Sequence, residues 1–279
     1  MPAPFVLSIQ SEVVYGHVGQ GAARFALQRL GFEVLALPTV LFSNHPGHGG
    51  MTGEAIPAGR LRDLLQGLTA RGLMGQIAGV LSGYLGVADQ AEVVAEAVAA
   101  VKAANRAALY LCDPVFGDEG GAYAKLGVAE AMARSLVPVA DIITPNRFEL
   151  TSLTARPVKG PEDARAALHS LGRPEGLVTS VPMPGGAIGT LAVQGPAVWL
   201  SEAPRVERPP HGTGDLLAAL YLGHRLKGLG VPEALGRASG AVDRLIREAV
   251  AAGSPELGLI EGQTALTDGP ALAVLGLSS

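Results

Sequence analysis

The 279-residue chain has little cysteine, little charge and no long apolar run. A single cysteine, Cys112, excludes an internal disulfide framework and is typical of a reducing compartment. The 21 Lys and Arg residues form no cluster and the net charge is −4, so nucleic acid and anionic membranes are poor partners. No apolar run reaches the ~18 residues of a membrane span, and the N-terminus lacks the basic segment of a signal peptide. We therefore expect a cytoplasmic protein.

Only 16% of the residues are charged, whereas 48% are hydrophobic. This composition allows a large core, and its sparse surface charge mildly favours a homo-oligomer. The chain contains no fixed repeat, low-complexity block or long linker. We therefore expect one domain over residues 1–279, because α/β folds of ~250 residues often form a single unit.

Short apolar runs alternate with amphipathic stretches along most of the chain. This alternation predicts an α/β fold, with a mostly parallel sheet covered by helices on both faces. Closely spaced runs joined by Gly and Pro in 176–201 predict an antiparallel edge. The predicted strands are 5–9, 32–38, 75–83, 107–115 and 140–145. The predicted helices are 19–31, 59–72, 88–105, 123–137, 146–154, 161–172, 213–228 and 232–251.

Polar or turn-forming residues follow four of the predicted strands. In open parallel sheets ligands bind beyond the carboxyl ends of the strands. We therefore expect one binding rim, formed by residues 10–11, 82–84, 113–114 and 144–146.

The stretch RPPHGTGDLLAALYLGHRL (208–226) places Asp215 at the start of an apolar helix. In one interpretation Thr213 caps the helix and Asp215 complements the helix dipole. In the other, Gly212 and Gly214 let backbone N–H groups approach an anion, and Asp215 accepts a proton from an attacking hydroxyl. Two glycines around Thr213 favour the second interpretation, because glycine is costly unless the backbone needs it.

Six segments in the same order resemble the pyridoxal kinases of the ribokinase superfamily. They are SIQSEVVYGHVGQGAARFALQRLG, TVLFSNHPGHG, LSGYLG, CDPVFGDEGGAY, DIITPNRFEL and GTGD, and together they extend from about residue 5 to about residue 250. The resemblance implies a ribokinase-like three-layer sandwich. It also implies ATP-dependent phosphorylation of the 5′-hydroxymethyl group of pyridoxal, with other B6 vitamers left open. Mg²⁺ and a homodimer are implied as well, and a monovalent cation is left open.

The resemblance also implies roles for individual residues. Asp215 would be the catalytic base, and residues 212–214 (Gly212, Thr213 and Gly214) would form the anion hole. Asp113 and Glu149 would hold the metal, with Asp118 assisting through water. The remaining substrate residues would be Ser11, Val18, Val40, Phe42, Pro46, Gly47 and Tyr84, and the remaining ATP residues Thr144, Thr179, Arg208, Pro209, Pro210 and His211.

Two positions depart from the family pattern. Pro46-Gly47, in a 39–50 segment expected to be a mobile loop over the substrate, replaces a common polar pair. Thr179 replaces a common lysine, and Arg208 could substitute for that lysine. Two alternatives stay open: a hydroxymethylpyrimidine-type kinase, which the same Asp215 machinery would serve, and a catalytically weak protein that binds B6 vitamers, which these two departures favour.

Two further local patterns also fit interpretations that involve no metal. Asn146 and Glu149 also fit a helix capping box, in which the glutamate serves the helix rather than a metal. His45 and His48 lack an evident third ligand, so their spacing does not favour zinc.

Overall fold

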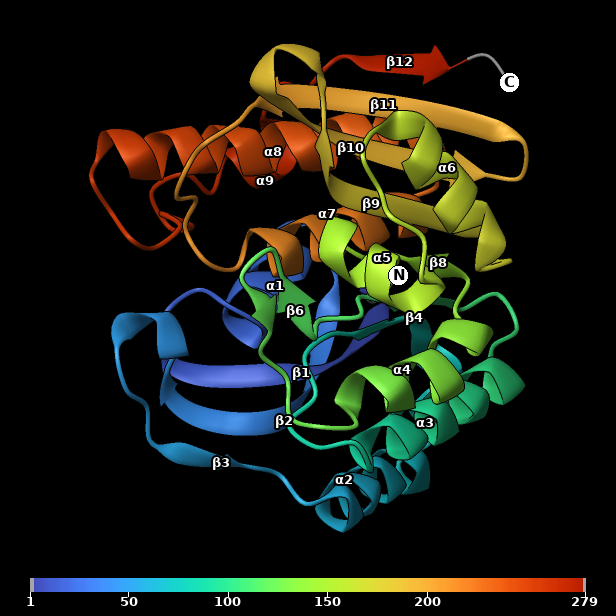
Figure 1. Ribbon diagram of the computed structural model, residues 1–279. Helices are drawn as coiled ribbons and strands as arrows, with labels where there is room; N and C mark the ends of the chain where they lie inside the picture. Colours follow the sequence, from blue (N-terminus) through green and yellow to red (C-terminus); the bar gives the residue numbers. More distant parts are fainter. Residues whose placement is uncertain (1–2, 278–279) are drawn as a thin grey trace.

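The computed structural model describes residues 3–277, which form ten strands of one sheet, a small hairpin and nine α-helices (Figure 1). The strands are β1 (Phe5–Tyr15), β2 (Glu33–Asn44), β3 (Gly53–Ala55), β4 (Ile77–Ser82), β5 (Leu109–Cys112), β6 (Gly117–Asp118), β7 (Gly121–Ala122), β8 (Ile142–Ile143), β9 (Glu175–Pro182), β10 (Ala187–Gln194), β11 (Ala197–Pro204) and β12 (Val274–Leu277). The helices are α1 (Gln20–Arg29), α2 (Ala58–Ala70), α3 (Gln90–Ala104), α4 (Val128–Ser135), α5 (Arg147–Thr154), α6 (Pro161–Ser170), α7 (Thr213–Leu226), α8 (Val231–Ala251) and α9 (Ala265–Asp268).

The sheet has the strand order β12-β11-β10-β9-β8-β5-β4-β1-β2-β3. The pairs from β2 through β9 are parallel, whereas β10, β11 and β12 are antiparallel at one edge and β3 at the other. The predicted α/β class, the parallel centre and the antiparallel edge are therefore confirmed.

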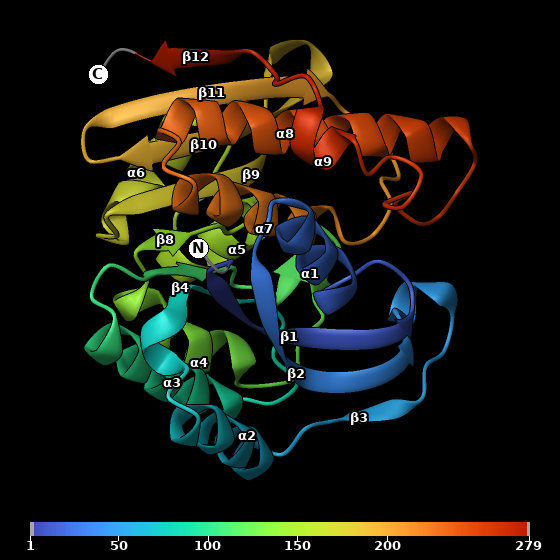
Figure 2. The same ribbon diagram turned by 180° about the vertical axis from the view of Figure 1, so that it is seen from behind.

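Helices cover both faces of the sheet, as Figures 1 and 2 show from opposite sides. Successive strand residues point to opposite faces, so Val6 packs under α1, α7 and α8, whereas Leu7 packs under α2, α3 and α4. This arrangement confirms the predicted three-layer sandwich. No helix within residues 3–277 is both long and apolar enough to cross a bilayer.

The segment before β12 passes directly over α8 and so brings β12 to the sheet edge. Leu272 N–H donates to the Gly236 carbonyl at 2.9 Å. A Cβ atom on Gly240 would lie 2.2 Å from the Pro270 carbonyl oxygen, so only glycine allows this approach. The segment then pairs β12 with β11.

Two local predictions are wrong. The 39–50 segment is not a loop throughout, because β2 continues to Asn44 by pairing with both β1 and β3, and only 46–48 forms a short 3₁₀ turn. The helix predicted from residue 123 begins at Val128, after a left-handed Gly127, because 117–122 forms the β6–β7 hairpin. Both changes depend on pairing between strands, which the local apolar pattern does not reveal.

Candidate active site

A cavity of about 880 Å³ lies beyond the carboxyl ends of the parallel strands, where they meet the start of α7. Ser11 from β1, Asp113 after β5 and Thr144 after β8 line it, as do Tyr84 and residues 209–215. The predicted rim is therefore one continuous site. On its far side the cavity is lined by β10, β11 and α8.

The start of α7 uses its two glycines for different reasons. Gly212 precedes the helix at φ 84°, and a Cβ atom there would lie 1.9 Å from the His17 carbonyl oxygen. A Cβ atom on Gly214 would meet nothing within 4 Å, although Gly214 lines the cavity, so its missing side chain keeps that space open. Thr213 makes no side-chain capping bond, so its interpretation as a cap is wrong.

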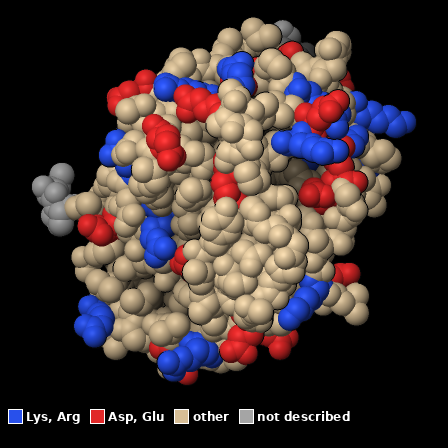
Figure 3. Space-filling view, turned by 90° about the vertical axis from the view of Figure 1, so that its left-hand side faces the viewer, with Lys and Arg blue, Asp and Glu red and all other residues tan. Residues whose placement is uncertain are grey.

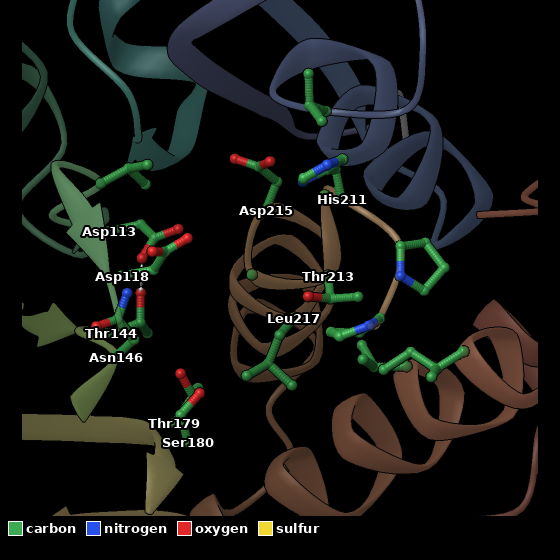
Figure 4. A pocket seen from close by; sticks show the side chains of 18 of the residues that line it. Asp113, Asp118, Thr144, Asn146, Thr179, Ser180, His211, Thr213, Asp215 and Leu217 are labelled. Carbon is green, nitrogen blue, oxygen red and sulfur yellow. Dashed lines mark hydrogen bonds between the residues drawn. The ribbon is translucent and has the colours of Figure 1, made fainter. Parts of the chain in front are cut away.

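Asp215 projects into the cavity from the first turn of α7, and Asp113 and Asp118 face it from the opposite wall (Figure 4). Burial raises the pKa of Asp215, whereas a hydrogen bond from the Gly19 backbone N–H opposes that shift. Gly19 is the N-cap of α1, so Asp215 lies where α1 and α7 both begin. A carboxylate in this position is stabilised by N–H groups and is still accessible from the cavity.

Asp113 is only 6% exposed and has no basic partner. Its Oδ1 accepts a hydrogen bond from Thr144 Oγ1 at 3.0 Å. Burial, and then the charge of Asp215, raise the pKa of Asp113 from its ordinary value of 3.8 to about 8, although the Thr144 hydrogen bond opposes the shift. Asp113 therefore holds a proton at neutral pH until a cation or a higher pH removes it.

Glu149 and Asn146 form the capping box of α5. Glu149 Oε2 accepts from the Asn146 N–H at 2.8 Å, Oε1 accepts from the Phe116 N–H at 3.1 Å, and the Asn146 side chain accepts from the Glu149 N–H. Glu149 is 2% exposed, and burial followed by the charge of Asp113 raises its pKa. The capping interpretation is thus confirmed, and the metal role of Glu149 stays a prediction.

The described wall of the cavity is acidic and contains neither Lys nor Arg. Its acidic residues are Asp113, Asp118, Glu149, Glu202, Asp215 and Asp243. No three or more His, Cys, Asp or Glu side chains within residues 3–277 converge as a ready metal cage. The wall instead fits a hydrated divalent cation, which takes only one or two carboxylates from the protein.

Comparisons with known proteins agree with this geometry. The family model for phosphomethylpyrimidine kinase matches residues 75–259. The pyridoxal kinase PdxY of Corynebacterium diphtheriae is 42% identical over 94% of this chain and 95% of the relative. The pyridoxal kinase PdxY of Rubrobacter xylanophilus is 42% identical over 95% of this chain and 94% of the relative. The chain belongs to the pyridoxal kinase family.

A solved structure of a pyridoxal kinase extends the likeness to the whole fold. The enzyme from Leishmania donovani, in complex with ADP and pyridoxine, is 31% identical and has a TM-score of 0.92. The alignment covers 98% of this chain and 99% of that one.

Most of the site residues predicted from the sequence line the cavity of this pyridoxal kinase family member. Besides the residues of α7 and the acidic wall, it is lined by Ser11, Val18, Phe42, Pro46, Tyr84, Thr144, Thr179, Pro209, Pro210 and His211.

Three of the selected residues lie outside this lining. Val40 is fully buried in the core, where its Cγ1 occupies the space that a Cβ atom on Gly86 would need. Gly47 forms a turn in which its N–H donates to His45 Nδ1 at 3.0 Å, and its α-carbon faces the His211 ring. Arg208 is exposed to solvent and does not line the cavity, so its role in place of the lysine missing at Thr179 stays a prediction.

Sequence reasoning missed the far end of the cavity and one aromatic residue. Ser201 and Ser239 place buried hydroxyl groups without a partner there, beside the apolar Val242 and Ile246. The only available signal was a serine within the apolar run of β11. Tyr123 also lines the cavity, but the sequence assigned it to a helix.

Proposed function

We propose that the protein transfers the γ-phosphoryl group of ATP to the 5′-hydroxymethyl group of pyridoxal and so forms pyridoxal 5′-phosphate. The observation that carries this proposal is the position of Asp215, an acceptor of raised pKa facing an open cavity at the first N–H groups of α7. Family membership supports the substrate, because a relative of the same fold binds ADP and pyridoxine.

Asp215 accepts the proton of the 5′-hydroxyl as its oxygen attacks the γ-phosphorus. A new O–P bond forms, the bond between the γ-phosphorus and the bridging oxygen breaks, and ADP leaves. The raised pKa makes Asp215 a better base near neutral pH, and the Gly19 N–H helps keep it ionised before the transfer. The N–H groups of residues 212–215 stabilise charge that develops on the equatorial oxygens.

The vitamer ring and the nucleotide would occupy opposite ends of the cavity. Phe42, Tyr84 and Val18 form an apolar and aromatic end, where the Ser11 hydroxyl supplies a polar contact for the ring. Residues 209–211 and Thr179 line the path toward the nucleotide. At the far end, the unpartnered hydroxyls of Ser201 and Ser239 beside apolar side chains suit the edges of an adenine ring.

Asp113 and Glu149 would hold Mg²⁺, partly through water. Bound there with the nucleotide, the ion supplies the positive charge that the described wall lacks. Because Asp113 faces Asp215 and no Lys or Arg lines the described wall, its raised pKa fits a site that is completed by a divalent ion. The proposal assigns no residue to a monovalent cation, and its effect is tested by varying K⁺ in the assay.

A phosphotransfer assay tests this function directly. The protein is incubated with ATP and pyridoxal, pyridoxine, pyridoxamine or hydroxymethylpyrimidine, with and without Mg²⁺ and with K⁺ varied. We expect pyridoxal to be phosphorylated at least about tenfold faster than the pyrimidine, and only with the divalent ion. The family model named for phosphomethylpyrimidine kinase supports the pyrimidine as the second candidate, and a faster pyrimidine reaction would favour it. Pyridoxal binding without ATP consumption at any Mg²⁺ concentration would favour a binding protein.

We further propose that residues 1–279 act as one domain in a cytoplasmic homodimer. The projecting ends of β1 and β2 expose Val14, Tyr15 and Leu41, the segment before β3 exposes Met51, and Figure 3 shows a broad uncharged area on that face. Such an apolar area favours burial against a second copy. Light scattering coupled to size-exclusion chromatography should give about twice the mass of one chain, and a monomer at micromolar concentration would contradict the dimer.

A further inference from the structure

Four of the six histidines gather beside the cavity, although they come from three separate segments of the chain. His17 lies between β1 and α1, His45 and His48 flank the turn after β2, and His211 precedes α7. One carboxylate joins this group, that of Glu256 in the loop after α8.

Glu256 contacts two of these segments at once. Its Oε1 lies 2.5 Å from His48 Nε2, and its Oε2 accepts the His17 backbone N–H at 2.6 Å. The carboxylate is 12% exposed and lies against Gly16, where a Cβ atom would come within 3.3 Å of Oε1. The two oxygens thus bridge the turn after β2 and the turn before α1.

A second contact fastens the same turn to the start of α7. The rings of His45 and His211 lie with centroids 4.1 Å apart, and His45 Nδ1 accepts the Gly47 N–H. Burial, and then the charge of His211, lower the pKa of His45 to about 4, so His45 is neutral near pH 7 and the two rings are not both charged.

We propose that Glu256 is a positioning residue for phosphoryl transfer. It does not line the cavity, so it acts through the segments that it joins. The turn at 46–48 follows Phe42 and contributes Pro46 to the cavity wall, and the segment at 16–19 ends at Gly19, whose N–H contacts Asp215. By holding these two segments together, Glu256 fixes the vitamer end of the cavity relative to Asp215. This inference rests on the proposed function.

Kinetics of paired variants test the inference. In Glu256→Ala we expect kcat/KM for pyridoxal to fall about tenfold or more, the scale of a lost charge-assisted hydrogen bond, while KM for ATP stays within about twofold. Glu256→Gln keeps an acceptor for the His17 N–H and should retain part of the activity. Glu261→Ala removes an exposed carboxylate from the same loop and should behave as wild type. His48→Ala added to Glu256→Ala should cause little further loss, because both changes break one contact.

Hydrogen–deuterium exchange separates failure of this inference from failure of the proposed function. Glu256→Ala should speed exchange in peptides covering 16–20 and 43–52 and leave the central strands unchanged, whichever substrate the protein uses. Unchanged exchange in either peptide would overturn the bridge. If kcat/KM fell equally for pyridoxal and for ATP, or if Tm fell while kcat/KM stayed normal, Glu256 would be a purely structural residue. Exchange as expected in a protein that phosphorylates no vitamer would retain the bridge and reject the kinase.

Discussion

Buried carboxylates lie at the two opposite rims of the sheet and differ in how their charge is compensated. Glu175, the first residue of β9, is 4% exposed and binds Arg225 through Nε and Nη2 at 3.0 Å each, the Tyr221 hydroxyl at 2.6 Å and Gln194 at 2.8 Å. Asp113, just after β5, has one hydroxyl partner and faces another carboxylate. The protein compensates charge where a carboxylate serves the fold, and leaves it uncompensated at the rim where we expect substrate and cation.

The largest expected effect is a loss of catalysis, and it concerns the rim that carries Asp215. Asp215→Asn should lower kcat by ~10²–10⁴ and leave pyridoxal and ATP binding nearly intact, because only the proton acceptor is lost. Single-turnover phosphotransfer and equilibrium binding would measure both. Asp89→Asn, an exposed acid-to-amide change, is the control. Equal turnover in the Asp215 variant would remove this residue from the chemistry.

Breaking the compensated group should cost stability instead. Glu175→Gln leaves the Arg225 charge without its partner, and we expect the free energy of unfolding to fall by about 3–5 kcal/mol. Denaturant unfolding would measure this, and kcat of the folded fraction should not change. Glu233→Gln breaks an exposed i,i+4 pair with Arg237 and should cost less than about 1 kcal/mol. Similar losses in both variants would show that burial of the Glu175 pair has no special role.

The Mg²⁺ requirement should depend on pH through Asp113. Its carboxyl group has a pKa of about 8, so below pH 8 a cation must displace a proton to bind. The apparent Mg²⁺ affinity should therefore fall by about tenfold for each pH unit from pH 8 to pH 6. Mg²⁺ titrations of the initial rate would reveal this slope, and Asp113→Asn should flatten it. A slope that is the same in both proteins would place the proton elsewhere.

The smallest expected effect is a gain of stability at the same residue. The pKa of Asp113 is raised from 3.8 in the unfolded chain to about 8 in the folded protein, so the folded state binds more protons between these values and its stability falls as pH rises. Asp113→Asn keeps an acceptor for Thr144 and lacks this loss, so we expect its free energy of unfolding without ligands to exceed that of wild type at pH 8 by at least about 1 kcal/mol. The gain should shrink toward pH 4, and a gain independent of pH would contradict this origin.

The sequence predicted the features that follow from local patterns. Alternating apolar runs predicted the layers, and the strand-end rule brought Ser11, Asp113 and Thr144 to one cavity. Contacts between distant segments were not predictable in this way. Glu256 meets His48 across 208 positions, because α8 returns the chain to the turn after β2. Ser201 and Ser239 likewise come to line one end of the cavity only because β11 and α8 pack together.

The glycines of α8 have a consequence for solubility. By letting the chain cross the helix at backbone distance, Gly236 and Gly240 deliver a four-residue strand to the outer side of the eight-residue β11. An uncovered β11 would offer a long row of free N–H and C=O groups to another molecule, whereas β12 offers a short one. Two residues without side chains thereby reduce the risk of edge-to-edge aggregation.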